Sequence, residues 1–312
     1  MLLIHVLISI FLRCSIAEPD YFLYHQQINL AEEDIVQEAF HSAQIKLEAV
    51  LTQYEFRFAK DLLLASQINL LLGQIEEGKY WAKEAFRGGY TLNCIRHIGV
   101  FKRKLTVSDW EQLESSYPKL RKTYLQKINL DLLQEFSRRY GVEQEAKRTD
   151  RYRTVVQRNF DRIKELMENE VGFPGEASIG IDYSRLAPQL TDCSGGNSKV
   201  IVTLLHYDHP IAHIGEEKFV KAIKQGQLHP REFGQIYSFE KSQVSILYRE
   251  NAKNIPSITD YQLNFPFSTK SADIEKVNLD RARFGIGKYQ VDQQKEETER
   301  KYGLKLRFNT DL

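Results

Sequence analysis

Residues 56–89, FRFAKDLLLASQINLLLGQIEEGKYWAKEAFRGG, decide the fold of the first half of this sequence. Phe56 to Leu72 is a run of helix formers, and Gly73 follows it where a left-handed C-cap would end a helix. A second helical run, from Glu76 to Arg87, stops at Gly88-Gly89. Two helices joined by so short a turn pack side by side, so the stretch predicts an antiparallel helical hairpin.

Small residues recur along the second of these helices, at Gly78, Ala82 and Ala85, and Leu64-Ala65 with Ile68 stands in the first. This pattern resembles a tetratricopeptide-type unit, whose two helices approach closely at such small residues. The match departs from the repeat of about 34 residues by one inserted residue, and it lacks the proline that usually closes the unit. The sequence shows one recognisable unit and one degenerate neighbour, whereas a free-standing solenoid needs roughly three.

The resemblance leaves two interpretations of the helical first half. In one, the hairpin forms a groove that binds a protein or peptide partner. In the other, the helices are a spacer that packs on the rest of the chain. Ala31 to Leu51 predicts one more amphipathic helix, because Ile35, Ala39 and Ile45 recur near helical spacing. Residues 18–118 are therefore expected to form a tetratricopeptide-like helical region.

The composition indicates a folded protein with more than one core. The 312 residues carry 43 Lys and Arg against 42 Asp and Glu, and 42% of them are hydrophobic. These values exclude a wholly disordered chain, and the net charge of +1 argues against a dedicated nucleic-acid binder. The length predicts about two domains, with residues 119–312 as the second. Tyr117-Pro118 is expected to separate them, since proline disfavours helix at the preceding residue.

The amino-terminal residues predict export. Leu2 to Leu12 is an apolar run too short to span a bilayer as a helix, and Ser15-Ile16-Ala17 offers small residues where a signal peptidase cuts. Cleavage after Ala17 would give a periplasmic or extracellular chain without a transmembrane segment; the alternatives are an uncleaved anchor or a wrongly assigned start of translation. In that compartment Cys94 and Cys193 form either one disulfide bridge or two buried thiols.

The second half is expected to be a mostly helical domain with at most a few short strands, which makes the fold class mainly α. Leu120 to Tyr140 predicts a helix that Gly141 ends, and Arg148 to Glu170 predicts a longer one, ended by Gly172-Phe173-Pro174. Two short apolar runs are open to interpretation as strands: Val200 to Leu205 and Gln243 to Tyr248.

Five short motifs occur one after another between Leu120 and Gly303. They are Glu143-Gln144, Gly172-Phe173-Pro174, Ile179-Gly180, Leu205-His206-Tyr207-Asp208 and Val277-Asn278 with Arg281, Arg283 and Gly285-Ile286. This order resembles a bacterial family of secreted or envelope domains of unknown function. The middle of this sequence departs from the family pattern. Glu240-Lys241 stands where the family has Asp-Arg, and Tyr261-Gln262 is a remnant of the family's Tyr-Gly-Thr-Gln segment. The resemblance implies no activity, and its departures indicate a divergent or inactive member.

One group of residues could carry acid–base chemistry. His206, Asp208 and Arg281 are candidate catalytic residues, because a histidine beside carboxylate and guanidinium groups suits an anionic substrate. Arg283 and Tyr207 are candidate binding residues in the same interpretation. The alternative is an ion-paired core that holds the carboxy-terminal segment against the histidine segment.

A metal site is another interpretation of the histidine segment. Four of the eight histidines lie between positions 206 and 229, and His206, Asp208 and His209 could hold a divalent metal such as zinc. Pro210 disfavours a helical arrangement of these ligands, and the alternative is a loop with surface histidines. No complete catalytic motif is present, so the sequence favours an interaction or accessory module. The alternative is a hydrolase-type enzyme that uses His206 and Asp208 with Arg281, with or without a metal.

Overall fold

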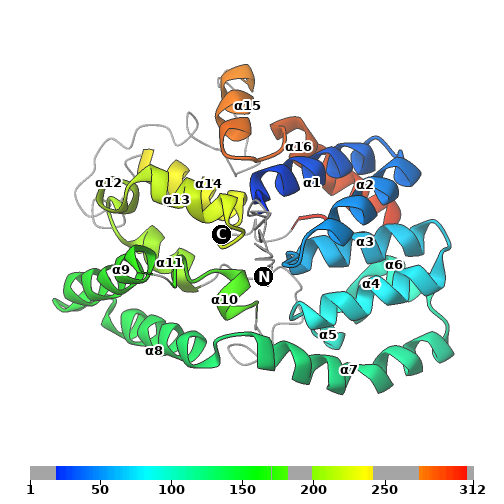
Figure 1. Cartoon of the computed structure of the whole chain (residues 1–312), viewed down its shortest axis with the longest axis horizontal. Helices are drawn as coiled ribbons and strands as arrows, with labels where there is room; N and C mark the ends of the chain where they lie inside the picture. Colours follow the sequence, from blue (N-terminus) through cyan, green and yellow to red (C-terminus); the bar gives the residue numbers. More distant parts are fainter. Residues whose placement is uncertain (1–18, 170, 182–198, 242–273, 308–312) are drawn as a thin grey trace, which may run out of the picture.

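The computed structural model describes residues 19–169, 171–181, 199–241 and 274–307. Within these ranges the protein has sixteen helices and no strand, which confirms the predicted mainly α fold class. Figure 1 shows the chain descending through the helices of the first half, turning along α7 (Val107–Lys127), and rising again through the second half. The chain thereby returns to its start, and α13 (Glu216–Lys224) and α16 (Tyr289–Tyr302) pack against α1 (Tyr21–Val36).

The first half consists of α1 to α7. Between α1 and α7 the helices are α2 (Phe40–Gln53), α3 (Ala59–Leu71), α4 (Ile75–Arg87), α5 (Leu92–His97) and α6 (Gly99–Lys104). The predicted hairpin is α3 with α4, and Gly73 ends its first helix with a φ of +82°. Gly78 is needed for the close approach, because a Cβ there would lie 2.5 Å from a terminal methyl carbon of Leu70. Both features are compatible with a tetratricopeptide-like hairpin.

The single helix predicted from Ala31 to Leu51 is wrong. The chain breaks between α1 and α2, where Glu38 adopts a left-handed φ of +62°. The amides of Gln37 and Ala39 donate to Glu33 and Asp34, which closes the end of α1. The helical spacing of apolar residues gave the wrong prediction, because Ala39 is exposed and Ile45 is 68% exposed. Neither side chain belongs to the buried face of a helix.

The predicted breaks at Tyr117-Pro118 and at Gly141 are also wrong. Helix α7 runs through Pro118, and α8 (Leu130–Ala146) runs through Gly141. A proline inside a helix costs about 3 kcal/mol. Here a capping box between Thr106 and Asp109 and the packing of α7 on α4 outweigh that cost. A boundary between separate domains at residue 118 would thus fall inside a continuous helix.

The second half consists of α8 to α15. After α8 come α9 (Tyr152–Glu168), α10 (Glu176–Ile179), α11 (Lys199–His206), α12 (Pro210–Ile214), α13, α14 (Pro230–Lys241) and α15 (Ile274–Arg283). Val200 to Leu205 lies in α11 and is therefore helical. The predicted signal segment, Cys193 and the possible strand from Gln243 to Tyr248 lie outside the described residues, whereas Cys94 is buried. None of the helices that the structure describes combines the length and apolar character that a bilayer crossing requires.

Two hydrophobic cores are present, and the end of the chain joins the first of them. One core runs from Tyr21 to Leu120 and the other from Leu132 to Ile286, but Leu304 and Leu306 are buried in the first. The Gln67 side chain fixes this segment, since its amide donates to the Lys305 carbonyl at 2.9 Å and its oxygen accepts from the Lys305 amide at 2.6 Å. The carboxy-terminal segment therefore completes the amino-terminal core.

Candidate functional site

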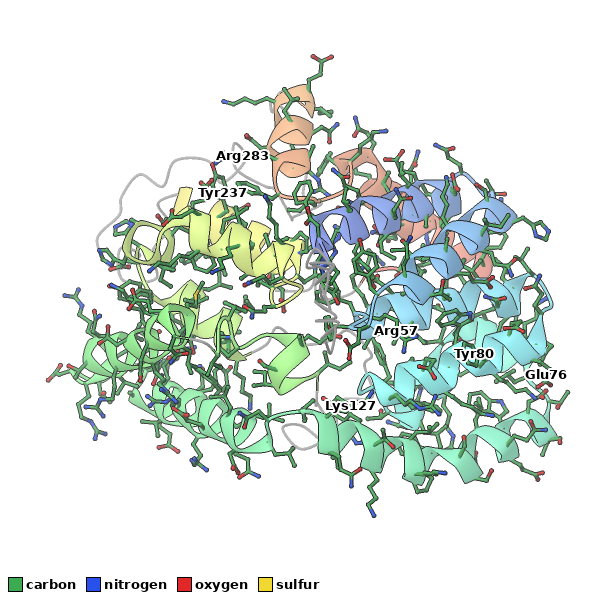
Figure 2. All side chains as sticks on the ribbon, viewed as in Figure 1. Arg57, Glu76, Tyr80, Lys127, Tyr237 and Arg283 are labelled. Atoms are coloured by element: carbon green, nitrogen blue, oxygen red, sulfur yellow. The ribbon has the colours of Figure 1, made fainter. Side chains whose placement is uncertain are left out.

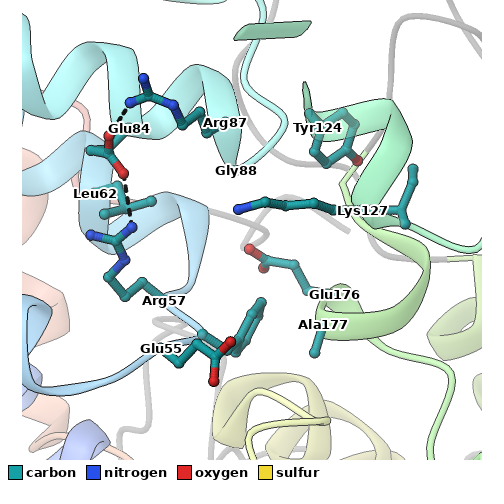
Figure 3. A pocket seen from close by; sticks show the side chains of 12 residues that line it. Glu55, Arg57, Leu62, Glu84, Arg87, Gly88, Tyr124, Lys127, Glu176 and Ala177 are labelled. Carbon is teal, nitrogen blue, oxygen red and sulfur yellow. Dashed lines mark hydrogen bonds and ion pairs between the residues drawn. The ribbon is translucent and has the colours of Figure 1, made fainter. Parts of the chain in front are cut away.

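A cavity of about 110 Å³ lies where the two halves of the molecule meet. Figure 3 shows that its walls come from the start of α3, the end of α4, the end of α7 and α10. Lys127 and Ala177 are exposed, so solvent reaches the cavity. The lining residues are Glu55, Phe56, Arg57, Leu62, Glu84, Arg87, Gly88, Tyr124, Lys127, Ile128, Glu176 and Ala177.

Three cationic side chains surround this cavity. Arg57 Nη2 lies 2.8 Å from Glu84 Oε2, and Arg87 pairs with the other oxygen of the same carboxylate. Lys127 reaches across the cavity from the end of α7, above the carboxyl group of Glu176 (Figure 3). Among the described residues, Lys127 makes no ion pair and no hydrogen bond through its ammonium group. Three carboxyl groups, those of Glu55, Glu84 and Glu176, also line the cavity, so its cations are in excess only while Glu176 is protonated.

Glu176 is a carboxyl group that the cavity keeps largely uncharged. Burial raises its pKa to about 8, and the nearby Glu232 and Asp61 act in the same direction. The Ala59 amide donates to Glu176 Oε1 at 2.6 Å and opposes part of that rise. At pH 7 the group is mostly protonated, and its hydroxyl can donate a hydrogen bond. Its neighbours in the sequence gave no signal of this role, which depends on α3 and α14.

A buried charge network, defined here as Glu32, Arg231, Arg281, Asp292 and Lys295, joins α1, α14, α15 and α16. Glu32 Oε2 lies 2.7 Å from Lys295 Nζ and 3.1 Å from Arg231 Nη2. Asp292 Oδ2 lies 2.7 Å from Arg231 Nη1 and also pairs with Arg281. Burial would raise the pKa of Glu32, but Lys295 and Arg231 outweigh it and lower the pKa to about 2.

The structure separates Arg281 from the histidine segment. Arg281 is fully buried and donates to Asp292 and to the Gly287 carbonyl. His206 is buried elsewhere, at the end of α11, where its ring pairs with Glu143. In Figure 1 α13 and α14 lie between α11 and α15. The predicted grouping of His206 with Arg281 is therefore not found, and each residue has its own partner, Glu143 for His206 and Asp292 for Arg281.

The other predicted binding residues also lie apart from the cavity. Arg283 pairs with Glu216, and Figure 2 places it well away from Arg57 and Lys127. Tyr207 stacks on Phe160 with ring centroids 3.7 Å apart, and its hydroxyl lies 2.6 Å from His213 Nδ1. These contacts give Tyr207 a packing role in the second core.

The residues predicted as metal ligands are not arranged as a metal site. His209 is exposed, whereas Asp208 is partly buried and His206 is paired with Glu143. Across residues 19–169, 171–181, 199–241 and 274–307, no group of three or more His, Cys, Asp or Glu side chains is placed to hold a metal ion. In the described part of the chain, the residues predicted to bind zinc are therefore not arranged around a common point.

No family model matches the sequence, and no curated protein or solved structure matches it either. The likeness to the bacterial envelope family and to tetratricopeptide units stays a prediction.

The pair of Glu143 and His206 is expected to stabilise the fold. Replacing Glu143 with alanine leaves the His206 ring without its partner. It also removes the shorter hydrogen bond of the buried Asn159 amide, which donates to Glu143 at 2.8 Å and to the Arg139 carbonyl at 3.3 Å. We expect the free energy of unfolding to fall by about 3 kcal/mol. Urea denaturation measures it, with Glu145→Ala as control, because Glu145 is exposed on the same helix. Equal stabilities of the two variants would contradict a structural role for the pair.

Proposed function

We propose that the protein is a binding module, an exported accessory protein that holds a small ligand in the cavity between its two halves. One observation supports it above the others: the cavity brings the unpaired cation Lys127 and the raised-pKa carboxyl group of Glu176 together from different helices. Convergent polar groups with shifted pKa values in a concave site are typical of ligand sites. The export follows from the apolar run and the cleavage expected after Ala17.

A binding role fits the described residues better than a hydrolase does. The enzyme hypothesis relied on His206 and Asp208 acting with Arg281, and Arg281 is fully buried against Asp292. His206 is also buried, and its Nδ1 is engaged by Glu143. The three residues on which that hypothesis relied therefore do not come together in the described part of the chain. The cavity around Lys127, in contrast, is accessible and carries groups that can bind.

The test fills the cavity with a large side chain. The full chain is expressed for export, and the mature amino terminus is sequenced, with Glu18 expected first. Thermal unfolding is then recorded with a panel of small carboxylates, phosphates, sugars and amines. The variants are Ala177→Trp, which fills the cavity, and Ala282→Trp, which places the same ring on an exposed position of α15.

At least one chemical class should raise the melting temperature of the wild type and of Ala282→Trp. Ala177→Trp should lose that shift while keeping the same far-ultraviolet circular dichroism spectrum. The proposal is overturned when no compound stabilises the wild type, or when Ala177→Trp responds as strongly as the control does.

A further inference from the structure

We propose that the ligand of this cavity is a small organic carboxylate, bound between the guanidinium groups of Arg57 and Arg87 and the ammonium group of Lys127. This inference rests on the proposed function and names the chemical class that the site selects. Its basis is the set of unused hydrogen-bond donors around the cavity, together with the size and the apolar part of its walls.

The two arginines keep donors available after they have paired with Glu84. Each guanidinium carries five N–H groups, and a single carboxylate shared by two arginines occupies only part of them. Arg57 and Arg87 approach Glu84 from two sides, at different oxygens. Glu84 thus holds both guanidinium groups at one wall without filling their donor capacity. A ligand carboxylate matches the planar arrangement of such donors.

Lys127 supplies charge from the opposite wall. Figure 3 shows its side chain extended across the cavity toward α3, and its ammonium group has no ion pair among the described residues. An exposed lysine normally gains little from one fixed conformation. A bound anion would give this ammonium group a partner at the point to which it reaches.

Glu176 suits a carboxylate ligand because it is mostly protonated at neutral pH. The charged and polar groups around it are Lys60, Asp61 and the Ala59 amide of α3, Glu232 of α14, Lys127 of α7, and Glu55, which lines the same cavity just before α3. In its neutral form it can donate a hydrogen bond to a ligand oxygen, whereas its ionised form would repel an anion. Binding should therefore weaken as the pH rises through about 8, the pKa of Glu176.

The volume of the cavity and the apolar side chains in its walls favour an organic anion over inorganic phosphate. An engineered cavity of about 150 Å³ accommodates benzene, so a cavity of about 110 Å³ suits a body of a few carbon atoms. Phe56, Leu62 and Ile128 line part of it, and such side chains favour contact with methylene groups over contact with a fully hydrated ion. Butyrate combines a carboxylate group with a short hydrocarbon chain, and its size suits a cavity of this volume.

Isothermal titration calorimetry with three probes tests this inference. Sodium butyrate is the expected ligand, butyramide is its neutral analogue, and inorganic phosphate is the inorganic anion. Butyrate should bind the wild type at least tenfold more tightly than either of the other probes. Lys127→Met should weaken butyrate binding about tenfold, whereas Lys122→Met, on an exposed position of the same helix, should leave it unchanged.

Glu176→Gln provides the readout for the neutral donor. Between pH 7 and pH 9 the protonated fraction of a group with a pKa of about 8 falls about tenfold, and the wild type should lose affinity in that proportion. Glu176→Gln cannot ionise, so its affinity for butyrate should stay constant across that range. A wild type with constant affinity would overturn the role of Glu176.

The outcomes separate this inference from the proposed function. If butyramide or phosphate binds as tightly as butyrate, or if Lys127→Met binds like Lys122→Met, the carboxylate assignment is wrong while the cavity remains a binding site. If no probe and no compound of the wider panel binds, the proposed function itself fails. Lys127 is exposed, so its replacement does not put the fold at risk.

Discussion

Replacing Asp292 with alanine is expected to lower the free energy of unfolding by about 4 kcal/mol, because buried cations lose their partner. Asp292 contacts Arg231, Arg281 and Lys295, and Glu32 alone cannot neutralise all three. Removing one member of a buried ion pair costs more than the pair itself contributes, since the remaining charge stays out of water. The effect is large because four helices from both ends of the chain meet at this network.

Chemical denaturation at neutral pH measures this effect. Asp150→Ala is the matched control, because Asp150 is exposed, and it should stay within about 0.5 kcal/mol of the wild type. A loss below about 1 kcal/mol in Asp292→Ala would show that the network is dispensable.

The same network gives the stability a dependence on acid pH. The folded pKa of Glu32 is about 2. Burial alone would raise the pKa of Asp292, but Arg231, Lys295 and Arg281 hold it well below its usual range. Stabilisation from these lowered pKa values is complete above the unfolded values near 4 and is lost as the pH falls toward 2. Asp292→Ala should therefore lose less stability than the wild type over that range.

Replacing both Leu304 and Leu306 with alanine is the second change with a large expected effect, a loss of about 5 kcal/mol. Both side chains are buried in the first core, and truncating one buried leucine costs about 2 to 5 kcal/mol. The segment that carries them is held by the Gln67 amide, so the truncation also loosens a buried polar group.

Leu279→Ala is the control for this double variant. Leu279 is 72% exposed on α15, so the same chemical change should alter the free energy of unfolding by less than about 0.5 kcal/mol. Equilibrium denaturation in urea compares the three proteins. If the double variant unfolds at the denaturant concentration of Leu279→Ala, the carboxy-terminal segment does not complete the first core.

The helices that the sequence predicted well are those with a local end signal. Gly73 and Gly89 adopt left-handed φ values just after α3 and α4, where the sequence placed helix ends. The errors at Pro118 and Gly141 have the opposite origin. At both positions packing on neighbouring helices outweighs a local preference against helix, and a single sequence does not show that packing.

The candidate site was less predictable than the fold. The cavity combines Arg57, Lys127 and Glu176 from separate segments, and none of the three stands in a motif. Polar residues cluster along the sequence in the histidine segment, yet His206 pairs with Glu143, which lies 63 residues earlier. Patterns along the chain reveal which residues could do chemistry, whereas only the tertiary arrangement decides which of them meet.

The pairing of Gln67 with Lys305 has a consequence for biosynthesis. The two residues are 238 positions apart, and a ribosome adds about 5 to 20 residues per second, so Gln67 emerges roughly 12 to 50 seconds before Lys305. During that interval the leucine-rich face of α3 lacks its final cover. The nascent chain should therefore depend on chaperones, and the first half should reach its native packing only after translation has passed residue 306.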